Sequence, residues 1–353
     1  MYLQTATKLI DKVNQEIFSL LPNNINADFI LTLTQDKNIS ISPEMVGQIQ
    51  KPAKALLQTG GKRWRPLLTI ITTLLLSDKN FSQSDLVELG AKAGAIVELA
   101  HNGSLIIDDI EDSALMRRGI DCAHISYGVD LAINAGNYLY FLPALAINKL
   151  PLSEKQLLQI YKVYCRQMGY MHLGQGMDII WHKNPNHFPT VDEYKTMCHL
   201  KTGALSQMAI EIGAILASGD ESKKQILVSV SKDIGLAFQI LDDITNLKIG
   251  NPGKERGDDL IEGKKSLPLI LYAHKGDQSK LISLIEQIQN SGLKNSTAEV
   301  DQLIALLEST NAISEASQIA TSLLEGSVNL ITANFPASEV RDFFIDLIRK
   351  FQK

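Results

Sequence analysis

The sequence predicts an all-α protein, a single large bundle of ten or more helices around a central apolar cavity. Apolar residues recur at steps of three and four along segments such as 86–106 and 226–241, which is the spacing of one helix face. No sustained alternation of apolar and polar residues appears, so strands should be few or absent. Turn-forming residues cluster at 21–24, 183–186 and 249–253, where helices are expected to break.

The chain is expected to form one domain, because no Pro/Gly/Ser-rich linker and no abrupt change in composition marks a boundary. Its expected parts are an N-terminal helical extension at 1–50, a core at 51–270 and C-terminal helices at 271–353, together one domain over 1–353. Thr190 followed by Glu193 has the pattern of a capping box, which predicts a helix that begins directly after Thr190.

Composition excludes several classes of protein. The chain has 353 residues, of which 45% are hydrophobic, and a net charge of -5, which argues against a nucleic-acid-binding surface. A small phosphorylated substrate stays open, because bound metal ions reverse the local sign of a site. The sequence contains no run of about 18 uncharged apolar residues, so no membrane span is expected. The cysteines, Cys122, Cys165 and Cys198, are widely spaced and odd in number, which suits a reducing cytoplasmic location.

Two acidic clusters end apolar helical stripes, DDIED at 108–112 and DDITN at 242–246. On a helix the first and last residues of each cluster share a face, and the second lies on its flank. Grouped carboxylates repel one another by about 1 kcal/mol or more per close pair, which a hard cation would relieve. Oxygen ligands favour Mg²⁺. Alone, such a cluster is more often a solvated helix end. The predicted metal ligands are Asp108, Asp109, Asp112, Asp242 and Asp243.

Basic residues accompany both clusters. The segment GGKRWRP at 60–66 allows close backbone approach to an anion and offers arginine forks, although alone it fits an exposed basic turn equally well. Arg117 and Arg118 follow the first cluster, and further lysines follow the second. His101 lies about two helical turns before Asp108, and alone it fits a core histidine better than a ligand. Two diphosphates with several magnesium ions would match this charge pattern.

Six motifs in a fixed order resemble those of the trans-isoprenyl diphosphate synthases, or polyprenyl synthetases. Between about 51 and 268 they are GGKRWRP, HNGSLIIDDIEDSALMRRG, GQGMD, KTGAL, FQILDD and GKKSLP. The resemblance implies the isoprenoid synthase fold, a homodimer and about three Mg²⁺ ions with substrate bound. It also implies head-to-tail condensation of an allylic diphosphate with isopentenyl diphosphate, with diphosphate released.

The resemblance implies a role for each matching residue. Metal ions would bind the five aspartates named above. The residues expected at the allylic diphosphate are Arg117, Lys201 and Lys264, with Lys254 helping to close a lid. The residues expected at the diphosphate of isopentenyl diphosphate are Lys62, Arg65, His101 and Arg118. Thr202 and Gln239 would direct oxygen dipoles at the allylic cation.

The chain departs from the family pattern at three positions. Asn246 ends the second cluster where aspartate is common, Ile107 stands where histidine often precedes the first cluster, and Asn137 replaces a frequent aspartate. Asparagine is a neutral oxygen ligand, so a weaker second metal site is expected. His182 and His187 are interpreted as solvent-exposed loop residues, because no further ligand lies at metal spacing.

Product length is expected to depend on the helix that carries Asp108. In this family, bulky residues four or five positions before that aspartate stop chain growth, and here these positions and the next turn are small: Ser104, Gly103 and Ala100. Geranylgeranyl diphosphate or a longer product is therefore expected. Two alternatives stay open. A class I terpene cyclase would need no second diphosphate site, and a non-catalytic subunit of a heteromeric synthase would usually lack aspartates in the first cluster.

Overall fold

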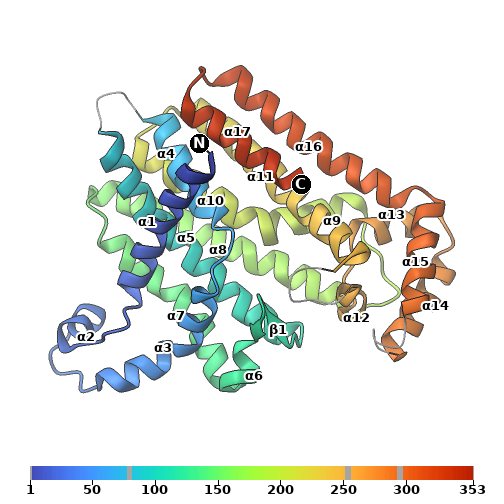
Figure 1. Ribbon diagram of the computed structural model, residues 1–353, viewed down its shortest axis with the longest axis horizontal. Coiled ribbons are helices and arrows are strands. Elements are labelled where there is room, and N and C mark those ends of the chain that lie inside the picture. Colours follow the sequence, from blue (N-terminus) through green and yellow to red (C-terminus); the bar gives the residue numbers. More distant parts are fainter. Residues whose placement is uncertain (1, 78–81, 251–255, 292–296, 353) are drawn as a thin grey trace. The chain divides into compact units, whose positions relative to one another are not determined.

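The computed structural model describes residues 2–77, 82–250, 256–291 and 297–352, and helices dominate them (Figure 1). The all-α class is confirmed. Within the described residues the strands are two segments of two residues, Met116–Arg117 (β1) and Ile120–Asp121 (β2). None of the described helices is long and apolar enough to cross a membrane. The chain forms two compact units, residues 1–164 with 208–224, and residues 165–207 with 225–353. One domain over the whole chain stays a prediction.

The first unit is built around the long helix α5, which contacts α1, α4 and α7. Small and branched apolar residues such as Ala93, Ile96 and Ala100 are fully buried along α5, so neighbouring helices surround it. The helices of this unit are α1 (Tyr2–Leu20), α2 (Ala27–Thr34), α3 (Pro43–Gln58), α4 (Trp64–Leu76), α5 (Gln83–Glu111), α6 (Ala123–Tyr127), α7 (Val129–Asn148) and parts of α8 (Glu154–His182) and α10 (Ala204–Ala217).

The second unit contains the rest of α8 and α10 and most of α11 (Glu221–Lys248). Its core includes Ile234, Ala237 and Ile240 of α11, the stripe predicted from the sequence. Its other elements are α9 (Val191–Cys198), the π-helical turn η1 (His199–Gly203), α12 (Asp258–Glu262), α13 (Leu267–Lys275), α14 (Gln278–Ser291), α15 (Thr297–Ser309), α16 (Ala312–Asn334), α17 (Glu339–Arg349) and the 3₁₀ turn η3 (Lys350–Gln352).

The predicted helix ends are confirmed. Helices α1, α8 and α11 end at Leu20, His182 and Lys248, at the predicted clusters of turn-forming residues. The capping box is also present: the Thr190 hydroxyl accepts a hydrogen bond from the Glu193 backbone N–H at 3.2 Å, and the Glu193 carboxylate accepts one from the Thr190 N–H at 2.7 Å. These bonds satisfy donors at the start of α9 that the helix itself leaves unpaired.

Candidate active site

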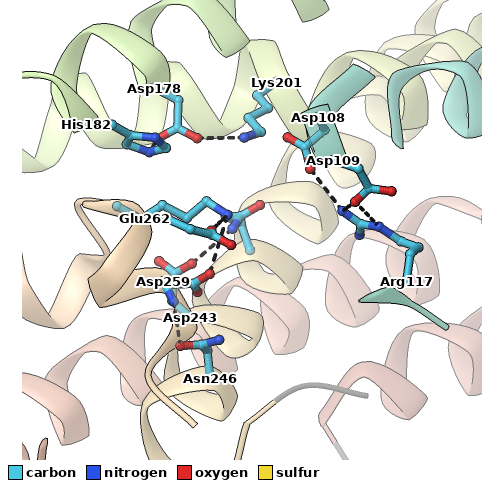
Figure 2. A network of polar contacts seen from close by, with 12 residues as sticks. Asp108, Asp109, Arg117, Asp178, His182, Lys201, Asp243, Asn246, Asp259 and Glu262 are labelled. Carbon is cyan, nitrogen blue, oxygen red and sulfur yellow. Dashed lines mark hydrogen bonds and ion pairs between the residues drawn. The ribbon is translucent and has the colours of Figure 1, made fainter. Parts of the chain in front are cut away.

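The first acidic cluster lies in the last turn of α5 and is paired with Arg117 of β1 (Figure 2). Arg117 Nε donates to Asp109 Oδ1 at 2.6 Å, and its Nη2 lies 3.2 Å from Asp108 Oδ2. The hairpin that carries Arg117 turns through Arg118 and Gly119, which both have positive φ, 52° and 82°. Two such residues define a type I′ turn, which fits the twist of a short hairpin. The turn therefore returns Arg117 to the carboxylates of α5.

Burial sets the electrostatics of this pair. Burial raises the pKa of Asp109, and the charge of Arg117 opposes that rise. Burial disfavours the charge of Arg117, but Asp109 and Asp108 hold its pKa above the ordinary value. In the described part of the chain, no three His, Cys, Asp or Glu side chains converge as a metal site. Asp108, Asp109 and Asp112 nevertheless offer only carboxylate oxygens, the donor type that suits Mg²⁺ with phosphate oxygens completing its shell.

A second group of predicted binding residues lies in the same unit, at the start of α4, on α5 and in the turn of the hairpin. Buried Arg65 places Nη1 3.3 Å from His101 Nε2. Arg118 Nη1 donates to the Gly60 carbonyl and lies 3.3 Å from Asn102 Oδ1. The structure thus brings Arg65, His101 and Arg118 together, as the sequence predicts, while Lys62 is exposed on the adjoining turn.

This group is strongly electropositive. Burial and the nearby charges of Arg65 and Arg118 hold the pKa of His101 well below its usual value, so the imidazole is neutral at pH 7. Burial lowers the pKa of Arg65 to about 10, which still leaves it charged. Arg65 Nε is buried and has no hydrogen-bond partner among the residues that the structure describes. A buried donor of this kind would gain a partner when an anion binds.

In the second unit, Lys201 is held by a buried carboxylate that the sequence analysis did not assign (Figure 2). Lys201 Nζ lies 2.6 Å from Asp178 Oδ2, and His182 Nε2 lies 2.8 Å from Asp178 Oδ1. Burial alone would raise the pKa of Asp178, but Lys201 and His182 hold it well below its usual range. The interpretation of His182 as an exposed loop residue is wrong: it ends α8, and its side chain is 12% exposed.

Lys201 and Thr202 belong to the π-helical turn between α9 and α10. Glycines on two neighbouring helices let the turn approach them closely. A β-carbon on Gly174 of α8 would lie 2.2 Å from the Lys201 backbone nitrogen, and one on Gly235 of α11 would lie 2.9 Å from the Gly203 Cα. Short π-helical segments are frequent at functional sites. Here the segment directs consecutive polar side chains of one motif to different partners.

The second acidic cluster lies near the end of α11, where Asp243 is buried in a network of donors (Figure 2). Tyr194 OH donates to Asp243 Oδ2 at 2.7 Å, and Gln239 Nε2 donates to Asp243 Oδ1 at 3.0 Å. Thr202 Oγ1 in turn donates to Gln239 Oε1 at 2.9 Å. Burial, with the charges of Asp259 and Asp242, raises the pKa of Asp243 to about 7. These bonds fix the orientations of Gln239 and Thr202.

Asn246 has a structural role that the sequence analysis did not predict. It is fully buried, and its side-chain oxygen accepts a hydrogen bond from the Asp259 backbone N–H at 3.3 Å. That bond ties α11 to the first turn of α12. Lys264 Nζ lies 3.4 Å from Asp259 Oδ1 and also pairs with Glu262. Two carboxylates that the sequence analysis did not name therefore hold the predicted lysine. Lys254 lies outside the described residues.

The residues predicted to limit product length lie along α5 in the first unit. Ala100 and Gly103 are buried, and Ser104 is half-buried, with its hydroxyl donating to the His101 carbonyl at 2.8 Å. The first unit contains a cavity of about 350 Å³ elsewhere, between α3, the end of α5, β2 and α6. Its lining includes Pro52, Leu56, Ile106, Asp109, Cys122 and Tyr127.

Sequence comparisons relate this chain to known proteins. Residues 46–307 match the polyprenyl synthetase family. A short chain isoprenyl diphosphate synthase of Methanocaldococcus jannaschii is 36% identical over 284 residues, which cover 77% of this chain and 83% of the relative. A geranylfarnesyl diphosphate synthase of Aeropyrum pernix is 31% identical over 303 residues, which cover 83% of this chain and 89% of the relative.

A comparison with solved structures agrees with this result. The crystal structure of geranylgeranyl pyrophosphate synthetase from Pyrococcus horikoshii Ot3 superposes with a TM-score of 0.83 at 24% identity. The match covers 100% of this chain and 98% of that one, which confirms the all-α synthase fold. Because the family match spans more than half of its length, the chain belongs to the polyprenyl synthetase family and is a prenyltransferase.

Proposed function

We propose that the protein condenses an allylic diphosphate with isopentenyl diphosphate, head to tail and with Mg²⁺, to give geranylgeranyl diphosphate or a longer product. One observation carries the proposal: two consecutive arginines of one hairpin contact different groups of residues. Arg117 pairs with Asp108 and Asp109, whereas Arg118 contacts Asn102 and the turn at Gly60. Two neighbouring anion sites on one helix suit a reaction that joins two diphosphate esters.

The residues divide the chemical work. Arg117, Lys201 and Lys264 would neutralise the allylic diphosphate as its carbon–oxygen bond breaks. When bound to Asp108, Asp109, Asp112, Asp242 and Asp243, Mg²⁺ would supply Lewis-acid stabilisation of that leaving group. Lys62, Arg65, His101 and Arg118 would hold isopentenyl diphosphate. Neutral His101 can donate one hydrogen bond to an anion without adding charge.

Oxygen dipoles would stabilise the allylic cation. Thr202 donates its hydroxyl proton to Gln239, which leaves the lone pairs of Thr202 Oγ1 for the cation. The carbon–carbon bond forms when the alkene of isopentenyl diphosphate attacks the cation. A proton then leaves the new chain, with the released diphosphate as its proposed acceptor.

The experiment supplies dimethylallyl, geranyl or farnesyl diphosphate with and without isopentenyl diphosphate. A product longer by five-carbon steps, formed only when both substrates are present, supports the proposal. Cyclic hydrocarbon formed from the allylic substrate alone would instead identify a terpene cyclase. No turnover by the purified single chain would favour a non-catalytic subunit.

We further propose that the protein is a homodimer. Helix α7 exposes Val129, Ile133 and Phe141, which are 51%, 41% and 75% exposed and lie four or eight residues apart on one face. A second copy of this chain is the proposed partner, as the family resemblance implies. Phe141→Asp should shift the mass measured by light scattering from dimer to monomer. We also propose a cytoplasmic location, because Cys122, Cys165 and Cys198, all described residues, form no disulfide.

A further inference from the structure

We propose that Glu98 and Asn102 are positioning residues for the second diphosphate site: through them, buried Arg63 fixes the guanidinium of Arg118. The inference rests on the proposed function, in which Arg118 binds the diphosphate of isopentenyl diphosphate. Neither Glu98 nor Asn102 is expected to touch substrate, and both would act through Arg118.

Arg63 is the first residue in this chain of contacts, and all three nitrogens of its guanidinium bond to other groups of the protein. Its φ of 46° at the start of α4 turns it into the interior, where its side chain is 1% exposed. Nη1 lies 2.6 Å from Glu98 Oε1, Nη2 donates to the Leu57 carbonyl at 2.8 Å, and Nε donates to Asn14 Oδ1 at 3.2 Å. Arg63 is therefore an internal counter-ion, unlike Lys62 and Arg65 on either side.

Asn102 connects Glu98 with Arg118. Its Nδ2 donates to Glu98 Oε1 at 2.9 Å and to the Glu98 carbonyl at 2.8 Å. The orientation of the amide is thereby set, and its Oδ1 accepts from Arg118 Nη1 at 3.3 Å. An aspartate at this position would place a second negative charge against Glu98, so asparagine is the side chain that can donate to one neighbour and accept from the other.

Arg118 is also confined from the opposite side. It donates to the Gly60 carbonyl, and a β-carbon on Gly61 would lie 3.1–3.3 Å from atoms of its guanidinium. Gly61 has a φ of 141°, so both its conformation and the neighbouring arginine favour glycine. The double glycine of the motif thus packs against Arg118, and Asn102 holds the same guanidinium from α5.

Glu98 also balances charge. Its carboxylate raises the pKa of Arg65 and of Arg118 against the lowering effects of burial and of neighbouring arginines. The buried carboxylate therefore offsets part of the positive charge that these arginines bring together. Charged, fixed donors lose less entropy when they bind a diphosphate than mobile ones do.

The experiment measures KM separately for isopentenyl diphosphate and for the allylic substrate. Asn102→Ala should raise KM for isopentenyl diphosphate about tenfold, as expected for one lost hydrogen bond to a charged group, and leave the allylic KM within about twofold. Gln50→Ala is the matched control: it removes a fully buried amide of the same unit, whose Nε2 donates to Tyr138 OH at 3.2 Å. It should leave both constants unchanged.

A double-mutant cycle distinguishes the inference from the proposed function. Arg118→Lys should itself raise KM for isopentenyl diphosphate, and Asn102→Ala should add little in that background. Full addition of the two effects would overturn the inference alone. An unchanged KM in Arg118→Lys would overturn the role of Arg118, and the inference with it. If Asn102→Ala does not fold, Glu98→Gln keeps the shape of the side chain but removes the negative charge that pairs with Arg63 and offsets the charges of Arg65 and Arg118. An unchanged KM for isopentenyl diphosphate in that variant would contradict the inference.

Discussion

Gly103 of α5 packs directly against Gly136 of α7. A β-carbon on Gly103 would lie 2.9 Å from the Gly136 carbonyl oxygen, and one on Gly136 would lie 2.7 Å from Ile107 Cδ1. The absence of a side chain at 103 therefore serves helix packing, whatever its effect on product length. Because the obstacle is backbone, we expect Gly103→Phe to lower the free energy of unfolding by at least about 3 kcal/mol, measured by urea denaturation. An unchanged midpoint would contradict this packing role.

Ser104 is the better position for testing product length. It is half-buried, and its only described side-chain bond is to the local His101 carbonyl, so a larger side chain has more room than at 103. We expect Ser104→Phe to fold and to shorten the main product by one or more five-carbon units, measured by mass spectrometry. Ser104→Thr is the control for loss of serine and should keep the wild-type product. The same product from Ser104→Phe would show that chain growth stops elsewhere.

Asp178 should control how Lys201 binds the allylic diphosphate. Asp178→Asn keeps the shape but removes the charge that holds Lys201, so we expect kcat/KM for the allylic substrate to fall about 10- to 100-fold. The control is Asp192→Asn, which removes the carboxylate of an exposed Asp–Lys pair with Lys195 at 3.3 Å. Equal kinetics for the two variants would mean that Asp178 does not position Lys201.

Lys265 should make stability depend on pH. It donates to the Pro185 carbonyl at 3.0 Å, and burial lowers its pKa from 10.5 to about 8. Between these values the unfolded chain binds the extra proton, so the contribution of Lys265 to stability rises as pH increases through this window. Urea unfolding at about pH 7.5 and about pH 10 should show wild type gaining stability relative to Lys265→Met. Lys183→Met, at an exposed lysine, should leave the pH dependence unchanged.

Local features of the sequence predicted local features of the structure well. The capping box at Thr190 and the helix ends depend on a few adjacent residues. The buried pair of Asp178 and Lys201 was missed, because its partners come from α8 and from a π-helical turn. No periodic pattern specifies how such a turn packs.

One wrong interpretation and one structural role that was not predicted have physical explanations. His182 was assigned to a loop because of the turn formers that follow it, although its spacing of four residues from Asp178 was a signal for a helical pair. The structural role of Asn246 was not predicted, because its motif usually ends in an aspartate, and the weaker second metal site expected from the asparagine stays a prediction. Its contact with the Asp259 backbone depends on how the chain returns to α11, which the motif alone does not encode.

The most direct test measures products by mass after incubation of the protein with farnesyl diphosphate, isopentenyl diphosphate and Mg²⁺. We expect linear prenyl diphosphates longer by five-carbon units, with one diphosphate released per bond. We also expect loss of this activity with EDTA, and a reduction of at least about 100-fold in Asp108→Asn, because the leaving diphosphate loses metal stabilisation. Elongation that persists without a divalent cation, or an unimpaired Asp108→Asn variant, would contradict the proposed reaction.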